Sequence, residues 1–209
     1  MTKTVFCDFD GTITAVETFA GMLKEFSPDL AARLMPQMYE RTLTLSEGVT
    51  RLLQSIESRR YGEILAYAES KPVREGFSEL LTELKKREIP FVIISGGLRG
   101  MIETVLDREK VLPLVKTIYA VDVDRKGEYL KANSDYADDN ELVAKGKIIS
   151  QWTGVEKIAI GDSVTDITLA RGADLVFARD RLIDYLQSEN IPYIPWDNFF
   201  QIRDYLSQH

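Results

Sequence analysis

The run Val5-Phe6-Cys7-Asp8-Phe9-Asp10-Gly11-Thr12 is an apolar stretch that carries two carboxylates in alternation and ends in a Gly-Thr turn. On a β-strand, residues i and i+2 point to the same side, so we expect Asp8 and Asp10 to face one common space. Two carboxylates held that close repel each other unless a cation lies between them or one of them keeps its proton. The alternative is an Asx-type turn in which the acids only cap the following helix.

Two further apolar runs also end in polar residues. Phe91-Val92-Ile93-Ile94 is followed by Ser95-Gly96-Gly97, and Lys157-Ile158-Ala159-Ile160 is followed by Gly161-Asp162-Ser163-Val164-Thr165-Asp166. In an open parallel sheet, ligand-binding groups gather just beyond the carboxyl ends of the strands. An acid pair, a hydroxyl with two glycines and a second acid pair at three such ends therefore predict one site for a metal ion and a phosphate group.

Helical and strand patterns alternate from residue 74 to the end of the chain. This alternation predicts an α/β fold with a doubly wound, Rossmann-like parallel sheet. Beyond the three runs above, the expected strands are 115–121 and 175–178. The expected helices are 73–88, 98–108, 140–152, 180–188 and 197–206, the last with Asp197 as its N-cap. A hairpin turn is expected at 126–128.

Residues 14–71 carry several short helical patterns and no convincing strand. They predict a small all-helical insertion between the first and second strands of a core that is formed by residues 1–13 and 72–209, and the family resemblance described below implies that this insertion is a cap. Such a lid would close over the strand ends and exclude water. The local signals expected within the cap are capping boxes at Thr14–Glu17 and Thr44–Glu47, an N-cap followed by proline at Ser27–Pro28, and a helix end or kink at Pro36.

The composition argues against several classes of protein. The 209 residues carry a formal charge of −7 and show no dense basic stripe, so we expect no nucleic-acid partner. Cys7 is the single cysteine, which excludes an intrachain disulfide, and we expect it to be a buried apolar residue turned away from Asp8. The only histidine, His209, argues against a histidine-based phosphatase or a His-rich zinc site. Because no apolar stretch is long enough to span a bilayer and no signal-peptide pattern precedes the first strand, we expect a cytoplasmic protein without a membrane partner.

Four motifs follow one another along the chain: Asp8-Phe9-Asp10-Gly11-Thr12, Ser95-Gly96-Gly97, Lys145, and Gly161-Asp162-Ser163-Val164-Thr165-Asp166. Together they resemble the four-motif signature of the haloacid-dehalogenase-type phosphatases. The resemblance extends over the whole predicted core. It implies a phosphomonoester hydrolase with a Rossmann-like core and a cap.

Finer similarity points to one branch of that family. The stretches Glu75-Gly76-Phe77, Ile89 to Gly97 and Phe177-Ala178-Arg179-Asp180 resemble the branch that acts on an enol-phosphate of methionine salvage. The phosphoserine phosphatases have a similar layout and are the alternative. A dehalogenase is disfavoured because Asp10 supplies an acid that dehalogenation does not need. The non-enzyme alternative is a catalytically silent relative that binds a phosphorylated ligand, but such relatives usually lack residues that are present here.

The resemblance implies roles for the acids. Asp8 is the expected nucleophile, which forms an aspartyl-phosphate. Asp10 is the expected acid, which protonates the leaving oxygen and later takes a proton from water. Mg²⁺ is the expected cofactor, because it prefers a few hard oxygen ligands and shares phosphate oxygens with the substrate. Its implied ligands are the Asp8 side chain, the Asp10 backbone carbonyl and Asp162, with Asp166 orienting metal-bound water from behind.

The resemblance also implies phosphate and substrate contacts. Lys145 is expected to neutralise the nucleophile and the transferring phosphoryl group. Its spacing from the last acid motif resembles the family pattern better than that of Lys147, the alternative two residues further on. Glu17 matches the position of a substrate-binding glutamate in phosphoserine phosphatases, and a capping-box role explains it equally well. The expected phosphate contacts are Thr12, Ser95, Gly96 and Gly97, the last three as a cradle at a helix N-terminus.

The expected partner is a small phosphorylated metabolite, and the chain is expected to act as a monomer or a homodimer. Arg41, Arg51 and Arg74 could recognise a polar group of such a substrate. Arginines are more often surface residues, so these three are left out of the predicted site.

Overall fold

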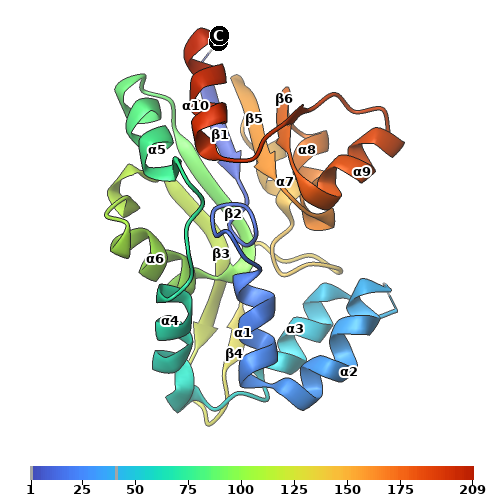
Figure 1. Ribbon diagram of the computed structural model, residues 1–209. Helices are drawn as coiled ribbons and strands as arrows, with labels where there is room; N and C mark the ends of the chain where they lie inside the picture. The colour runs from blue at the N-terminus through green and yellow to red at the C-terminus, as the bar shows by residue number, and fades with distance from the viewer. Residues whose placement is uncertain (1, 41) are drawn as a thin grey trace.

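Strand β1 (Thr2–Cys7) lies at the centre of a seven-stranded sheet (Figure 1). The computed structural model describes residues 2–40 and 42–209. All neighbouring strands run parallel except β3 and β4, which form an antiparallel hairpin. The order across the sheet is β4 (Lys131–Asn133), β3 (Thr117–Asp124), β2 (Phe91–Leu98), β1, β5 (Val155–Gly161), β6 (Leu175–Ala178) and β7 (Ile194–Pro195).

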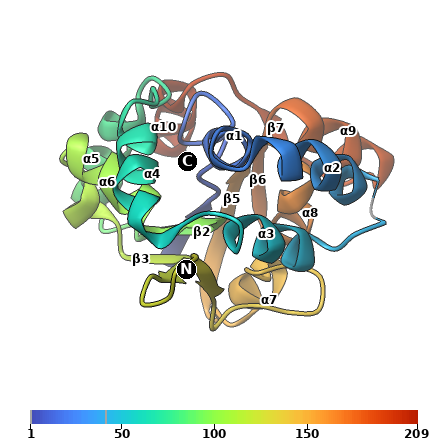
Figure 2. The same ribbon diagram turned by 90° about the horizontal axis from the view of Figure 1, so that it is seen from below.

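Helices cover both faces of this sheet. The central strands are accordingly apolar throughout, with Val5, Phe6 and Cys7 fully buried, as expected for parallel strands that face helices on both sides. One face carries α5 (Phe77–Lys86), α6 (Arg99–Arg108) and α10 (Phe199–Gln208), and the other carries α7 (Lys145–Ser150), α8 (Ile167–Arg171) and α9 (Asp180–Ser188) (Figures 1 and 2).

A helical cap lies beyond the carboxyl ends of the strands (Figure 1). The two chain crossings between cap and core lie side by side, because the Ala15 N–H donates to the Pro72 carbonyl and the Arg74 N–H donates to the Ile13 carbonyl, both at 2.9 Å. We call residues 13–15 and 72–74 the neck. The cap helices are α1 (Thr18–Phe26), α2 (Pro28–Tyr39), α3 (Leu45–Leu53) and α4 (Tyr61–Glu69), and the short 3₁₀ helices are η1 (Ser58–Arg60) in the cap and η2 (Leu112–Leu114) and η3 (Val164–Asp166) in the core.

The second half of the cap is attached to the core away from the neck. The Ser58 N–H donates to the Glu128 carbonyl at 2.8 Å, and the Leu130 N–H donates to the Ile56 carbonyl at 2.9 Å, which ties the start of η1 to the β3–β4 hairpin. Helix α4 packs along α6, where a Cβ at Gly100 would overlap the Tyr61 hydroxyl. Glycine therefore permits the close approach of these two helices.

The architecture confirms the expected fold class, a doubly wound and mostly parallel α/β sheet with a helical cap after the first strand. The strand at 175–178 and the helix at 180–188 have the expected bounds, and the turn at 126–128 lies in the β3–β4 hairpin. The two-residue strand β7 has no counterpart in the expectations. No helix in the two described ranges is long and apolar enough to cross a membrane.

Of the two predicted capping boxes, the structure has the N-cap hydrogen bond of the one at Thr44, and it contradicts the one at Thr14. Thr44 caps α3 as expected, and its side chain accepts a hydrogen bond from the Glu47 N–H at 3.1 Å. Thr14 does not cap α1, which begins only at Thr18. Its hydroxyl donates instead to the Val16 carbonyl at 2.9 Å. Thr14 therefore stabilises the turn before α1.

Other helix boundaries also differ from expectation. The helix expected at 73–88 spans only Phe77–Lys86. Helix α2 continues through Pro36 to Tyr39, because Met35 and Met38 beside the proline are buried in the core of the cap. The helix expected at 140–152 begins at Lys145, because an Asx turn precedes it, in which Asp138 accepts from two backbone N–H groups. The last helix is capped by Asn198 rather than by Asp197.

Candidate active site

Three buried acids meet where β1 and β5 end. Asp8 follows the last residue of β1, and its N–H donates to the Ile160 carbonyl of β5 at 3.0 Å, which fixes its position at the sheet edge. Asp162 follows the last residue of β5, and Asp166 ends η3. The exposed fractions of the three residues are 3%, 5% and 1%. Acids this deeply buried require charged or hydrogen-bonding partners.

Lys145 supplies one such partner. It is the first residue of α7 and is 2% exposed. Its Nζ lies 2.6 Å from Asp8 Oδ1 and 2.6 Å from Asp166 Oδ1. Lys147, the alternative, points away: its side chain is 70% exposed and its Nζ lies 3.6 Å from Asp138. Of the two lysines, Lys145 is the one that the fold brings to the acids.

Backbone donors hold the remaining oxygen of Asp166. Its Oδ2 accepts hydrogen bonds from the Asp162 N–H at 3.0 Å and from the Ser163 N–H at 3.1 Å. A Cβ at Gly161 would lie 2.7 Å from the Asp166 side chain, so a larger residue does not fit at that position. The turn after β5 thus wraps around one carboxylate and aims its other oxygen at Lys145.

Burial and the proximity of the acids to one another shift the pKa values of the groups in the site. Burial raises the pKa of Asp8 well above its usual value, the Asp166 carboxylate raises it further, and Lys145 opposes both effects. Burial and Asp166 raise the pKa of Asp162 to about 7. Burial disfavours the charge on Lys145, but Asp166 and Asp8 outweigh it and raise its pKa. The site therefore carries more negative charge than one lysine neutralises, and a further cation would stabilise it.

The same three acids fit a metal ion. Asp8, Asp162 and Asp166 each offer a carboxylate oxygen, and these oxygens lie within 4.8 Å of one another. Hard oxygen ligands of this type suit Mg²⁺, which commonly takes only one or two carboxylates and keeps several waters. The acid cluster at this sheet edge is therefore a candidate metal site.

The Asp10 side chain lies beyond the end of β1 and contacts the start of the cap. Strand β1 ends at Cys7, so the alternation that was to bring Asp8 and Asp10 to one space does not extend to residue 10. The Asp10 carboxylate instead accepts hydrogen bonds from the N–H groups of Thr18 and of Phe19, the latter at 2.8 Å. The capping role considered as the alternative therefore describes this side chain in the structure. Burial, and next the nearby Glu17, raise the pKa of Asp10 well above its usual value.

The Ser95-Gly96-Gly97 segment also differs from its expected setting. It lies within β2, and the next helix begins only at Arg99, so these residues do not form a helix N-terminus. Ser95 is 1% exposed, and its hydroxyl accepts a hydrogen bond from the Gly97 N–H at 3.1 Å. The pairing register of β2 with β3 shifts between Ile94 and Leu98. The segment is an irregular end of the strand next to β1 rather than a helix start.

Two further predicted residues lie on either side of the acids. The Thr12 hydroxyl donates to Asp162 Oδ1 at 2.6 Å, so this side chain supports an acid. Glu17 is exposed and occupies the N-cap position of α1 without a side-chain hydrogen bond to the helix. Its charge acts on Asp10 and Asp162. The capping-box explanation of Glu17 is therefore wrong.

One residue beside the site was missed. Arg74, set aside as a surface residue, donates from its guanidinium to the carbonyls of Gly11 and Thr12 at 2.7 and 3.1 Å. Arg51 pairs with Glu47 on the surface of the cap. Arg41 lies outside the described residues.

Cys7 behaves as expected of a small apolar residue. It is fully buried, and burial, more than any neighbouring charge, raises the pKa of its thiol. A thiol kept neutral in this way is a poor nucleophile.

A model of the haloacid dehalogenase-like hydrolases matches residues 5–171, a range that contains every acid of the site. The chain belongs to this family. Over 206 residues, this hydrolase is 68% identical to the 2-hydroxy-3-keto-5-methylthiopentenyl-1-phosphate phosphatase of Microcystis aeruginosa strain NIES-843, with 99% of the chain and 98% of the relative covered. A protein of the same name from Bacillus cytotoxicus is 31% identical over 217 residues, with coverage of 100% and 97%.

Solved structures agree with the haloacid dehalogenase-like fold. A phosphoserine phosphatase with a phospho-aspartyl intermediate analogue superimposes with a TM-score of 0.74 at 20% identity, covering 98% of each chain. A substrate-bound phosphoserine phosphatase gives a TM-score of 0.73 at 18% identity with the same coverage. At these identities the similarity concerns the fold alone, and it confirms the expected Rossmann-like core with a helical cap.

Proposed function

We propose that this hydrolase dephosphorylates 2-hydroxy-3-keto-5-methylthiopentenyl-1-phosphate, with Mg²⁺ as cofactor and Asp8 as nucleophile. The observation that carries the proposal is the 68% identity, over 99% of the chain, to the Microcystis phosphatase that bears this substrate in its name. The buried cluster of Asp8, Lys145, Asp162 and Asp166 supports it, because a silent relative would not need to keep buried acids that repel one another.

In the first step, a carboxylate oxygen of Asp8 attacks phosphorus. The new oxygen–phosphorus bond forms as the ester oxygen departs, which leaves an aspartyl-phosphate on Asp8. Lys145, 2.6 Å from Asp8, offsets the charge on the nucleophile and on the phosphoryl group as it transfers. Because Asp166 also accepts from Lys145 at 2.6 Å, the ammonium group stays aimed at the reacting oxygen.

Asp10 is proposed as the acid and base. It gives its proton to the departing oxygen, and it takes a proton back from the water that hydrolyses the aspartyl-phosphate. A pKa raised by burial and by Glu17 supports the protonated form that the first step requires. The hydrogen bonds from Thr18 and Phe19 leave this carboxyl at the boundary between core and cap, where a leaving group would lie.

The donor set supports Mg²⁺ as the cofactor. Asp8, Asp162 and the Asp10 backbone carbonyl would hold the ion, with Asp166 beside them. When bound, Mg²⁺ would neutralise the phosphate oxygens and the acids together. The core is proposed to contact the phosphate group through Thr12, Ser95, Gly96 and Gly97. The cap, which spans residues 14–71, is proposed to contact the substrate through Glu17.

The metal-free protein is expected to lose stability as the pH rises from about 4 to about 7. Asp162 has a pKa of about 7 in the fold, against about 3.9 in an unfolded chain. In this window the folded state therefore holds a proton that the unfolded state has released, and the free energy of unfolding falls. The loss from this group amounts to about 4 kcal/mol at most, since one pKa unit corresponds to about 1.4 kcal/mol.

Urea unfolding in the presence of a chelator, at about pH 5 and about pH 8, measures how steeply the free energy of unfolding falls with pH. Asp162→Asn is expected to flatten the slope, and Mg²⁺ is expected to stabilise the wild-type protein more at the higher pH. Equal slopes for the two proteins would contradict the prediction.

The experiment that tests the proposed function is phosphate release from a panel of phosphorylated metabolites, with and without Mg²⁺. The panel includes the methylthiopentenyl enol-phosphate and phosphoserine. A Mg²⁺-dependent preference for the enol-phosphate is the expected result. A preference for phosphoserine would favour the alternative enzyme and make Glu17 a ligand of the substrate amine. No turnover of any ester would favour a silent binding relative.

A further inference from the structure

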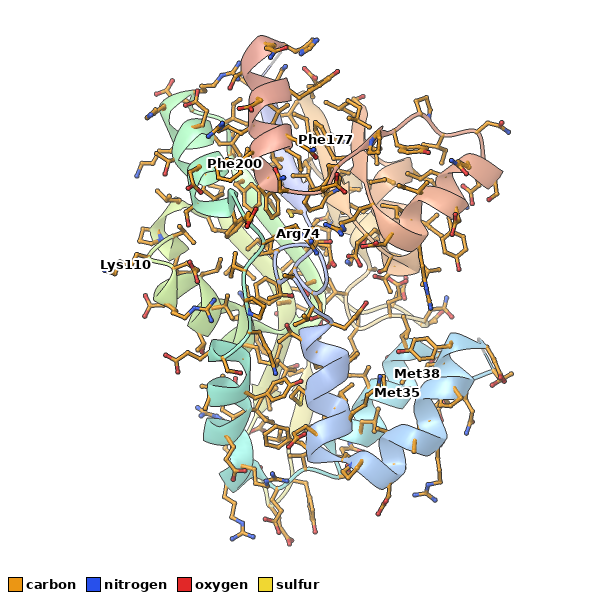
Figure 3. The ribbon with its side chains drawn as sticks, in the orientation of Figure 1. Met35, Met38, Arg74, Lys110, Phe177 and Phe200 are labelled. Atoms are coloured by element: carbon orange, nitrogen blue, oxygen red, sulfur yellow. The ribbon has the colours of Figure 1, made fainter. Side chains whose placement is uncertain are left out.

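We propose that Arg74 is a positioning residue that holds the Gly11–Thr12 turn in place and, through Thr12, orients Asp162. Its guanidinium donates to two consecutive backbone carbonyls, from Nη2 to Gly11 at 2.7 Å and from Nε to Thr12 at 3.1 Å. Arg74 lies in the neck, immediately beside the loop that follows β1 (Figure 3). The inference rests on the proposed phosphatase function, because it assigns Asp162 to the metal site.

The turn that Arg74 contacts lies directly against an acid of the site. Gly11 has a φ of +82°, and a Cβ there would lie 2.7 Å from Asp162 Oδ2. The next residue, Thr12, donates its hydroxyl to Asp162 Oδ1 at 2.6 Å. Thr12 is fully buried, so this hydrogen bond is shielded from water. A small displacement of the turn would therefore move the hydroxyl that fixes the Asp162 carboxylate.

Two features fix the position of Arg74 itself. Its backbone N–H donates to the Ile13 carbonyl at 2.9 Å within the neck. Its guanidinium carbon lies 5.6 Å from the ring centroid of Trp196, which is 3% exposed. Cation–π contacts of this kind occur within about 6 Å of the ring centroid. The guanidinium thus has a backbone anchor and an aromatic support, and it presents its donors to the turn.

These contacts distinguish positioning from substrate binding. Arg74 Nε and Nη2 are both directed at backbone carbonyls, in the bidentate arrangement that the planar guanidinium favours and that lysine cannot reproduce. Groups that orient a metal ligand from behind typically change metal affinity or activity by about 10–100-fold when removed. Loss of Arg74 should therefore act on metal binding and on kcat, and should leave KM nearly unchanged.

Arg179 provides a matched control on the same aromatic ring. Its guanidinium carbon lies 5.2 Å from the Trp196 centroid. Its hydrogen bonds run to Asp180 at 2.7 Å and to the Asp197 carbonyl at 3.0 Å, and neither partner belongs to the Gly11–Thr12 turn. Arg179→Met removes one cation from the Trp196 ring and leaves the hydrogen bonds of Arg74 to the Gly11–Thr12 turn in place. Arg74→Met removes a cation from the same ring and also removes those hydrogen bonds.

Two measurements on Arg74→Met and Arg179→Met test the inference. Hydrogen exchange of metal-free protein follows the amides of residues 11–14, since Ile13 and Thr14 donate to the Phe9 carbonyl within this turn. Thermal stabilisation by added Mg²⁺ gives the apparent metal affinity without any substrate. For Arg74→Met we expect faster exchange of this segment, and an apparent Mg²⁺ affinity and a kcat that are each lower by about 10–100-fold. Arg179→Met should match the wild-type protein.

The other outcomes overturn the inference. A raised KM with unchanged Mg²⁺ affinity would make Arg74 a substrate ligand, and equal effects of both variants would assign the result to Trp196. If Arg74→Met does not fold, Arg74→Lys replaces it, and wild-type exchange of residues 11–14 in that variant would refute the role. Failure of the wild-type protein to turn over the enol-phosphate refutes only the proposed function, because the exchange measurement needs neither metal nor substrate.

Discussion

Asp8→Asn is expected to abolish phosphate release, with a fall in kcat of about 10⁴-fold or more, as for other enzymes that lose their nucleophile. An amide is a far weaker nucleophile than a carboxylate, so no aspartyl-phosphate can form. The remaining groups of the site would still bind the phosphate ester, and KM should change little by comparison. Phosphate release under saturating Mg²⁺ and enol-phosphate measures the loss.

Unfolding experiments provide the control for this variant. Asp8→Asn removes one of three crowded acids, and Lys145 keeps Asp166 as a partner at 2.6 Å. The metal-free variant should therefore be at least as stable as the wild-type protein near pH 8, because Asp8 is an acid whose pKa burial raises. Activity within about tenfold of wild type would show that Asp8 is not the nucleophile.

Lys145→Met is expected to reduce both activity and stability. The ammonium group is 2% exposed and lies between Asp8 and Asp166, so its removal leaves two buried carboxylates without their cation. Breaking a buried pair in this way costs about 3–5 kcal/mol. Loss of a charge that stabilises the transition state lowers kcat by about 10²–10³-fold. Urea unfolding of the metal-free protein and steady-state kinetics measure the two effects.

The destabilisation should depend on pH. Because burial raises the pKa of Asp8, this acid accepts a proton more readily as the pH falls, and the loss of Lys145 should cost less near pH 5 than near pH 8. Lys147→Met is the matched control, since its side chain is 70% exposed, and it should change stability by no more than about 0.5 kcal/mol. Equal effects of the two substitutions would contradict the assignment of Lys145.

The meeting of distant residues at one sheet edge could be predicted from the sequence. Asp8, Ser95 and Asp162 each follow or end an apolar run, and parallel strands bring such ends together regardless of the loops between them. Lys145 has no such strand signal and was chosen by resemblance to a family pattern. Its burial against Asp8 and Asp166 supports that choice.

The hydrogen bonds of Asp10 to α1 could not be predicted, because the strand rule holds only while the strand continues. Strand β1 ends at Cys7, and the chain turns through Gly11 at a φ of +82°. Arg74 was missed for a different reason. Its contacts are with backbone carbonyls 62 and 63 positions away, and no side-chain pattern near residue 74 encodes such a partner.

The attachment of α4 determines which part of the cap can swing. Two backbone hydrogen bonds, from Ser58 to Glu128 and from Leu130 to Ile56, tie the chain to the β3–β4 hairpin before α4 begins. An opening that keeps this tether moves the segment from α1 to α3, about the neck at one end and Ile56 at the other, and it breaks the hydrogen bond that the Ser46 N–H of α3 donates to the Asn140 carbonyl at 2.9 Å. Helix α1 also holds the Asp10 carboxyl at its first N–H groups. A cap movement that admits a substrate must therefore either break the hydrogen bonds between Asp10 and α1 or move the Asp10 side chain together with the helix. Access to the site is in this way coupled to the position of its proton donor.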